Sequence, residues 1–165
     1  MDTVGRMAWV VDLVKAWYPP FDPSVVVREA SGILKGYGVA SIIGDNYAGE
    51  WPVESFKNCG IAYERAEKHK SELYLSLIPT VNAKLIELPD HHKLIEELRR
   101  LERRRGRSGK DSIDHPPRLS DDLANSVARL VHLVLNDADG GSSGFNPRFH
   151  VAATHLLPAT ASQFT

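Results

Sequence analysis

Acidic residues at two distant positions of the chain have the type and setting of divalent-metal ligands. Asp45 follows the short apolar segment 39–43, and the pair Asp121 and Asp122 opens an apolar-striped segment much later in the chain. Mg²⁺ and Mn²⁺ prefer oxygen ligands, and two such ions held by convergent carboxylates can hydrolyse a phosphodiester. Each position also has an ordinary interpretation, because a Gly-Asp-Asn sequence is typical of a turn and an acidic pair is typical of a helix N-cap. The two positions make a metal site only in a fold that brings them together.

The basic segment 99–110, with the sequence RRLERRRGRSGK, is a second candidate site. It carries seven basic residues and one acidic residue in a chain whose net charge is −1. Such a cluster at a helix end and loop can bind DNA phosphates without reading sequence, with an affinity that falls steeply as salt rises. The alternative is an arginine-rich helix face that is simply solvated. The candidate DNA contacts are Arg103, Arg104, Arg105, Arg107 and Lys110.

The composition is that of a folded domain of modest size. With 165 residues, 42% of them hydrophobic, we expect one domain over 1–136, followed by a flexible Gly/Ser-rich segment and tail over 137–165. The single cysteine, Cys59, excludes an intrachain disulfide and a CxxC metal site. The sequence contains no apolar stretch long enough for a membrane span and no signal-peptide pattern. We therefore expect a cytoplasmic location and no membrane partner.

The order of predicted elements in the first part of the chain favours an α/β fold. Residues 7–17 are rich in valine and tryptophan and stop at two prolines, which predicts a strand. A helix should follow, capped by Asp22 with Pro23 at its first position and ending at Gly36. The apolar run 39–43 predicts a strand covered on both faces. A strand, a helix and a strand in this order favour a parallel crossover in a layered domain.

Helices and short strands are expected to alternate in the rest of the chain. The predicted elements are helices over 52–58, from about Ser71 through Val81 with a kink at Pro79, and over 91–104, and strands over 61–64 and 85–88. The helix from Ser71 should bury one apolar stripe, made of Leu73, Tyr74, Leu77, Ile78 and Val81. The last helix should begin near Ser120 and bury Leu123, Val127, Leu130, Val131 and Val134.

Six segments resemble one known family, in the order of these elements. They are PPFDP (19–23), YGVASIIGDNYAGEW (37–51), GIAYERAEKHKSELY (60–74), LIPTVNAKLIELPD (77–90), LERR (101–104) and SGKDSIDHPPRLSDDLANSVA (108–128). With them the chain resembles the C-terminal nuclease domain of phage terminase large subunits, the motor-nuclease that cuts concatemeric viral DNA during packaging. The resemblance implies a ribonuclease-H-like α/β fold with a mixed sheet flanked by helices. It also implies double-stranded DNA, an ATPase domain and other terminase or portal components as partners.

The same resemblance implies a site in which acidic residues hold two Mg²⁺ or Mn²⁺ ions. The family's strand-end aspartate falls on Asp45, and its helix-start acid falls on the Asp121 and Asp122 pair. We prefer Asp121 as the ligand because it falls on the inward stripe of the predicted helix, with Asp122 as the alternative. Lys70 matches the family's KSELY segment and is a candidate contact to the DNA backbone. His115 is a candidate either for a DNA contact or for a hydrogen bond that stabilises its loop.

The resemblance is incomplete on its N-terminal side. The family's first catalytic aspartate lies on a strand upstream of the one that matches 7–17, and no Walker phosphate-binding motif occurs in the chain. We therefore expect a domain whose first strand or strands are missing, weak single-metal occupancy, and little or no cleavage of DNA by this chain alone. The alternatives are a catalytically inactive prophage remnant or packaging interaction module, and a junction resolvase whose first carboxylate comes from 1–18.

Overall fold

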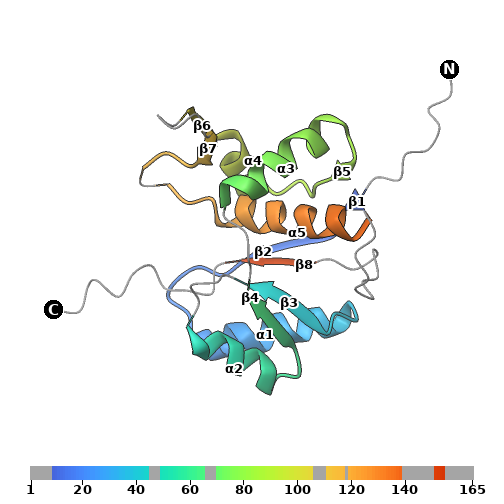
Figure 1. Cartoon of the computed structure of the whole chain (residues 1–165). Helices are drawn as coiled ribbons and strands as arrows, with labels where there is room; N and C mark the ends of the chain where they lie inside the picture. The colour runs from blue at the N-terminus through green and yellow to red at the C-terminus, as the bar shows by residue number, and fades with distance from the viewer. Residues whose placement is uncertain are drawn as a thin grey trace. The chain divides into compact units, whose positions relative to one another are not determined.

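The computed structural model describes residues 9–44, 49–65, 70–105, 111–117, 119–138 and 151–154 (Figure 1). The chain divides into two compact units, one formed by Met1–Val14 with Lys68–Ala152 and the other by Lys15–Glu67 with Ala153–Thr165. Strand β2 (Leu13–Ala16) pairs with β8 (Val151–Thr154), and the units divide within these two strands. Within the described ranges, every helix is too short or too polar to cross a bilayer.

Helix α1 (Pro23–Gly36) has the ends that its sequence predicts. The Asp22 carboxylate accepts a hydrogen bond from the Ser24 N–H at 2.8 Å. Pro23 occupies the first turn, where an N–H has no partner within the helix and its loss costs little. The buried side chains of the helix are Val26, Val27, Ala30, Ser31 and Leu34. The predicted cap and helix are therefore confirmed.

The same unit contains a parallel pair of strands, β3 (Ser41–Gly44) and β4 (Ala62–Arg65), joined by helix α2 (Glu50–Asn58). Phe56 of α2 is fully buried, and its ring lies 6.0 Å from the ring of Tyr63 on β4. Ser41 is exposed and the rest of β3 is half-buried, so the prediction of a strand covered on both faces was wrong. The apolar run is explained instead by packing in a two-stranded sheet beside α2.

Glycine at the end of β3 leaves room for a side chain from the neighbouring strand. A Cβ atom at Gly44 would overlap the phenol group of Tyr63, which comes from the neighbouring strand. Any other residue at this position would force the two strands apart or displace the tyrosine ring. The glycine of the Gly-Asp sequence is thus fixed by a neighbouring side chain.

The other unit packs three helices around one apolar core: α3 (Lys70–Asn82), α4 (His92–Arg99) and α5 (Asp122–Ala138) (Figure 1). Helix α5 contacts both of the others. The buried core residues of the three helices are Leu73, Tyr74, Leu77, Leu94, Leu123, Ala124, Val127, Ala128, Leu130, Val131 and Val134. Each large aliphatic side chain buried in this way contributes roughly 1.5–3 kcal/mol. The inward stripe predicted for the last helix is confirmed.

The N-terminal strand is shorter than predicted. Instead of one strand over 7–17, the structure has β1 (Trp9–Val10) and β2, separated by Val11 and Asp12. Strand β1 runs parallel to β5 (Ile86–Glu87), and the exposed Asp12 lies where this ladder has ended. Strand β1 pairs in parallel with β5, and β3 with β4. The parallel crossover predicted from the first two strands would instead pair β2 with β3, and in the described residues β2 pairs with β8 and β3 with β4.

Two residues of the stripe predicted for α3 are exposed. Ile78 and Val81 are 43% and 39% exposed, whereas Thr80 is buried. Ile78 is turned by about 100° from the buried Leu77, and Val81 lies in the last turn of the helix. Pro79 lies inside α3, as predicted.

The predicted helix over 91–104 is wrong in its second half. Helix α4 ends at Arg99, and 102–105 form strand β6 (Glu102–Arg105), which pairs antiparallel with β7 (Asp111–Asp114). Helix propensity is a weak preference, and the backbone hydrogen bonds of this hairpin override it. In the described part of the basic segment, 99–105, the helix therefore ends at Arg99, and 102–105 form a strand and not a continuation of the helix.

Candidate metal and DNA site

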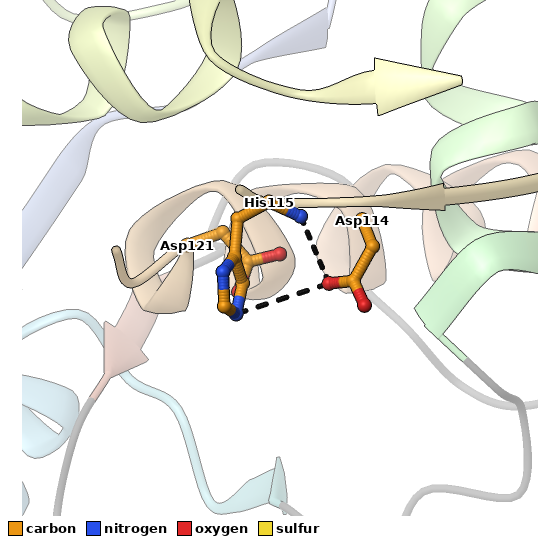
Figure 2. A group of neighbouring side chains, drawn as sticks. All are labelled: Asp114, His115 and Asp121. Atoms are coloured by element: carbon orange, nitrogen blue, oxygen red, sulfur yellow. Dashed lines mark hydrogen bonds and ion pairs between the residues drawn. The ribbon is translucent and has the colours of Figure 1, made fainter. Parts of the chain in front are cut away.

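Three potential metal ligands lie together where β7 ends and α5 begins. Asp114 is the last residue of β7, His115 follows it, and Asp121 directly precedes α5 (Figure 2). One ligand atom from each of the three lies within 4.8 Å of the other two. The Nε2 atom of His115 is 3.8 Å from Asp114 Oδ1 and 3.7 Å from Asp121 Oδ1. A strand end and a helix start thus bring two carboxylates and an imidazole to one point.

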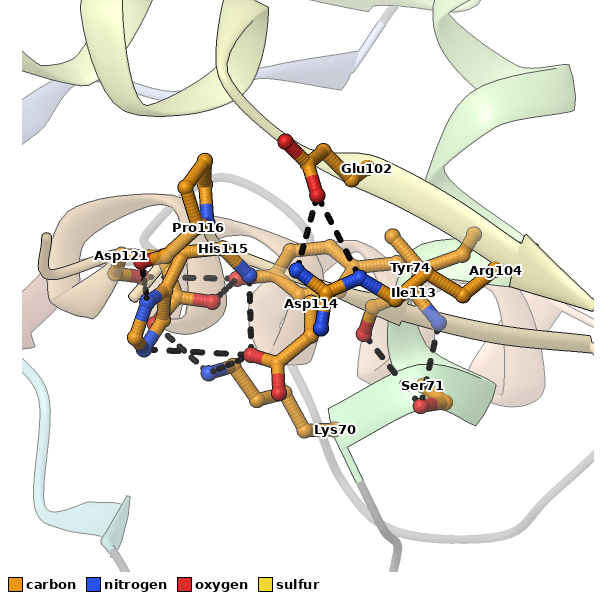
Figure 3. A network of polar contacts seen from close by, with 10 residues as sticks. All are labelled: Lys70, Ser71, Tyr74, Glu102, Arg104, Ile113, Asp114, His115, Pro116 and Asp121. Carbon is orange, nitrogen blue, oxygen red and sulfur yellow. Dashed lines mark hydrogen bonds and ion pairs between the residues drawn. The ribbon is translucent and has the colours of Figure 1, made fainter. Parts of the chain in front are cut away.

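The first turn of α3 supplies two further side chains to this cluster. Lys70 and Tyr74 are four residues apart and therefore lie on the same face of the helix. The Lys70 ammonium lies 2.8 Å from Asp114 Oδ1 and 2.7 Å from Asp121 Oδ1, so it forms an ion pair with both carboxylates (Figure 3). The Tyr74 hydroxyl donates a hydrogen bond to the other oxygen of Asp121, Oδ2, at 2.6 Å. Both oxygens of Asp121 are thereby held by α3.

The contacts within the cluster shift the pKa values of Asp114, Lys70 and Tyr74. The hydrogen bond from Lys70 lowers the pKa of Asp114. Partial burial alone would lower the pKa of Lys70, but its hydrogen bonds to Asp114 and Asp121 outweigh burial, and the pKa is raised overall. Burial, followed by the hydrogen bond to Asp121, raises the pKa of Tyr74 well above its usual range. At neutral pH the cluster therefore contains an ionised Asp114, a charged ammonium and a neutral phenol.

The carboxylate of Asp121 faces the cluster because another residue caps α5. Residue Asp121 is only 4% exposed, and its backbone carbonyl accepts the Asn125 N–H at 2.7 Å. Glu97 of α4 reaches the start of α5, where its Oε2 atom accepts the N–H groups of Leu123 at 2.8 Å and Ala124 at 3.0 Å. The N-cap interpretation of the acidic pair is therefore only partly right: Asp121 supplies the backbone carbonyl, and a glutamate from another helix supplies the side-chain acceptor.

Glu97 should control the stability of the α5 start. We expect Glu97→Ala to lower the free energy of unfolding by about 2 kcal/mol, because it leaves two buried N–H groups without an acceptor. Urea unfolding measures this, and Glu97→Gln, which keeps an acceptor oxygen, should cost less. Glu96→Ala is the matched control, since Glu96 forms a surface pair with Arg100 and its loss should change stability by about 0.5 kcal/mol or less. If Glu96→Ala and Glu97→Ala lower the free energy of unfolding equally, Glu97 does not cap α5.

The pH dependence of stability gives a second test of Glu97. Burial raises the pKa of this carboxyl in the folded chain, despite the two N–H groups that lower it. The contribution of Glu97 is therefore fully present below the unfolded pKa of about 4.3 and is lost as the pH rises through the raised folded pKa. The free energy of unfolding should therefore decline as the pH rises toward neutral, in part because Glu97 loses its proton. Glu97→Gln cannot ionise, so we expect this variant to show a smaller decline in urea unfolding measured at several pH values.

The structure places some of the predicted site residues and not others. Asp121 and Lys70 lie in the cluster, and His115 approaches both carboxylates while its Nδ1 atom contacts the Pro116 carbonyl at 2.8 Å. Asp122 is the half-buried first residue of α5. Three further predicted residues, namely Asp45, Arg107 and Lys110, lie outside the described residues.

The register of the hairpin separates the three described arginines of the basic segment. Arg104 and Glu102 lie on the face of the hairpin that also carries Asp114, because Glu102 pairs directly with Asp114. Arg104 is held by Glu102 at 2.8 Å, and this hydrogen bond raises the pKa of the guanidinium (Figure 3). Arg103 and Arg105 alternate with Arg104 along the exposed strand and so lie on the opposite face. Arg104 is thus the arginine of the strand that shares a face with the carboxylates.

Comparison with known proteins places this arrangement in a known fold. No family model and no curated protein sequence matches the chain. Solved structures do match, among them the large terminase nuclease from thermophilic phage G20c with bound magnesium, at 23% identity, with a TM-score of 0.57 over 68% of this chain and 62% of that one. The same nuclease with bound cobalt matches at 22% identity, with a TM-score of 0.57 over 68% of this chain and 62% of that one. The large terminase nuclease domain of Thermus phage P74-26 matches at 22% identity, with a TM-score of 0.55 over 74% of this chain and 63% of that one. The fold is that of a large terminase nuclease domain.

The terminase nuclease fold bears out the predicted class, an α/β ribonuclease-H-like fold. The family resemblance seen in the sequence is confirmed at the level of the fold. The chain spans about three fifths of the length of the solved terminase nuclease domains that it matches.

Sequence reasoning missed Asp114 as a member of the site. Its signal is the alternation in strand β7, where Ile113 is buried at 2% exposure and the next residue must point to the opposite face. The helical period predicts Tyr74 in the core stripe, and Tyr74 is fully buried there, but its hydroxyl also donates a hydrogen bond to Asp121. A buried tyrosine needs a partner for its hydroxyl, and that requirement was the available signal.

Proposed function

We propose that the chain is a metal-dependent endonuclease domain that cuts double-stranded phage DNA during packaging. The observation that carries this proposal is the cluster of Asp114, His115 and Asp121 at a strand end and a helix start, in a chain with a terminase nuclease fold. Solved nucleases of this fold hold magnesium or cobalt, and a divalent ion is the group that such a donor set suits.

The donor chemistry of the cluster fits Mg²⁺ or Mn²⁺. Asp121 and Asp114 offer hard carboxylate oxygens, and we retain Asp45 as a further proposed ligand, with Asp122 as the alternative to Asp121. A bound ion would supply a Lewis acid and lower the pKa of a bound water. The chain's own part would be ligand geometry, and Tyr74 would fix the rotation of the Asp121 carboxylate through its hydrogen bond to Oδ2.

DNA would reach this site past the basic strand β6. Arginine side chains bind phosphates as bidentate donors, so Arg103, Arg104 and Arg105, together with the undescribed Arg107 and Lys110, are proposed contacts to the backbone. A contact between Lys70 and DNA requires the ammonium to leave the two carboxylates that it now holds. An ATPase domain and other terminase or portal components are proposed partners, and we retain the proposed division into a domain over 1–136 and a tail over 137–165.

One observation favours the second candidate function, a catalytically silent packaging module or prophage remnant. The Lys70 ammonium already neutralises part of the charge of Asp114 and Asp121, as a metal ion would. A site balanced in this way can be stable without any ion, and the chain would then keep the fold and the basic strand for DNA binding alone.

Plasmid nicking distinguishes the two functions. The endonuclease proposal expects slow conversion of supercoiled plasmid to open circles in Mn²⁺, no conversion in the presence of a chelator, and loss of conversion on Asp45→Ala. Asp90→Ala is the matched control, because it removes an exposed carboxylate from the turn before α4. No conversion by the unmodified chain would favour the silent module.

A further inference from the structure

Lys70 occupies the position of a cation in the proposed metal site. Its ammonium contacts Oδ1 of Asp114 and Oδ1 of Asp121, the same two oxygens that lie closest to Nε2 of His115. The side chain of Lys70 is 31% exposed, compared with 52% for Asp114 and 5% for Asp121, so Lys70 and Asp114 are open to solvent while Asp121 is buried beneath them. Figure 3 shows Lys70 reaching from α3 to both acids.

We propose, on the basis of the proposed metal site, that Lys70 is a built-in competitor for the divalent cation and sets its affinity. A Mg²⁺ ion binds carboxylate oxygens at about 2.1 Å, so an ion on Asp121 Oδ1 would lie within about 5 Å of the ammonium in its present place. Two like charges at that distance in a half-buried site repel each other strongly. The ion must therefore displace the ammonium or bind weakly beside it.

The Lys70 ammonium also stabilises the site when no metal ion is bound. The Oδ1 atoms of Asp114 and Asp121 share the Lys70 ammonium as a counter-charge, and without it the two carboxylates would repel each other. Lys70 thus stabilises the ion-free site by the same contacts with which it opposes the ion. A divalent ion should be able to replace it in this stabilising role.

The test is Mn²⁺ binding to the full chain, measured by isothermal titration calorimetry. We expect Lys70→Met, which keeps much of the side-chain length without the charge, to lower the Kd for Mn²⁺ about tenfold, a typical size for coupling between two sites. Lys70→Arg keeps the charge and should bind Mn²⁺ no more tightly than the unmodified chain. Lys57→Met, which removes an exposed charge from α2, should leave the Kd unchanged.

Thermal unfolding supplies a second measurement. Without metal, Lys70→Met should melt at a lower temperature than the unmodified chain, and saturating Mn²⁺ should close this gap, whereas NaCl of the same ionic strength should not. If Lys70→Met is unfolded without metal, refolding by Mn²⁺ supports competition. Failure to refold in Mn²⁺, together with an unchanged Kd in Lys70→Gln, overturns it.

The outcomes separate this inference from the proposed function. A Kd in Lys70→Met that equals or exceeds that of the unmodified chain overturns the competition, even if the chain nicks plasmid. Tighter Mn²⁺ binding in Lys70→Met supports it, even if no variant cuts DNA. Absence of Mn²⁺ binding in both the unmodified chain and Lys70→Met also overturns it.

Discussion

Asp121→Asn is expected to weaken Mn²⁺ binding by about 100-fold or more and to abolish any metal-dependent nicking, because it removes the buried carboxylate of the proposed metal site. The Asp121 side chain is 5% exposed, and its carboxylate is fixed by Lys70 on one oxygen and by Tyr74 on the other. An amide has one neutral oxygen for the ion and presents an NH₂ group to one of these two donors. Calorimetry measures the loss of Mn²⁺ binding, and plasmid conversion measures the loss of cleavage.

Asp122→Asn is the matched control for this experiment. It makes the same chemical change one residue later, at the first position of α5, where the side chain is half-buried. The Kd for Mn²⁺ should change by less than about threefold, as expected for a nearby charge that does not coordinate the ion. A larger loss of binding for Asp122→Asn than for Asp121→Asn would assign the ligand to Asp122. Circular dichroism of both variants shows whether the helices have formed.

The parts of the site that the sequence predicts are those with a local cause. Asp22 and Pro23 start a helix by a hydrogen bond and a fixed dihedral angle within three residues, and the structure contains both. The inward stripe of α5 follows from a 3.6-residue period that runs through most of the helix. The same period places Asp121 one turn before Asn125, at the edge of the buried face.

The parts of the site that the sequence does not predict depend on contacts between segments distant in the chain. Glu97 looks like a charged residue on a helix surface, yet it is buried because the start of α5, more than twenty residues later, needs an acceptor. Strand β6 lies in a sequence of arginines with helical spacing, and only pairing with β7 makes it a strand. Asp114 joins the site through Lys70, which comes from a helix 44 residues earlier in the chain.

These distant contacts follow one arrangement. Helix α3 holds the acids through Lys70 and Tyr74, and it also fixes the end of β7, because Ser71 exchanges hydrogen bonds of 3.3 Å with the backbone N–H and carbonyl of Ile113. One helix turn therefore positions both the strand end and the helix start that carry Asp114 and Asp121. A displacement of α3 would disturb both carboxylates at once, so variants in this turn should affect metal binding more than their distance from the ion suggests.

DNA binding by the basic strand is expected to depend strongly on charge. Replacing Arg103, Arg104 and Arg105 with glutamine should lower the affinity for nonspecific duplex DNA by about 10- to 100-fold at low salt, and reduce the slope of log K against log salt by about two to three. Fluorescence anisotropy between about 50 and 200 mM salt measures both quantities. The control replaces Arg28, Lys35 and Lys57, three cations of α1 and α2, with glutamine, so the net charge changes equally. Equal effects of the two triple variants would refute a DNA site on β6.

The hairpin register makes this prediction specific to single residues. If DNA lies over the carboxylate cluster, Arg104 should account for about one unit of the salt slope, because it shares a face with Asp114. Two of its N–H donors are occupied by Glu102, at 2.8 and 3.3 Å, which leaves the rest of the guanidinium for a phosphate. Arg104→Gln should therefore weaken binding more than Arg103→Gln. The reverse order would place the duplex on the other face of the hairpin, away from Asp114, and would separate DNA binding from the proposed metal chemistry.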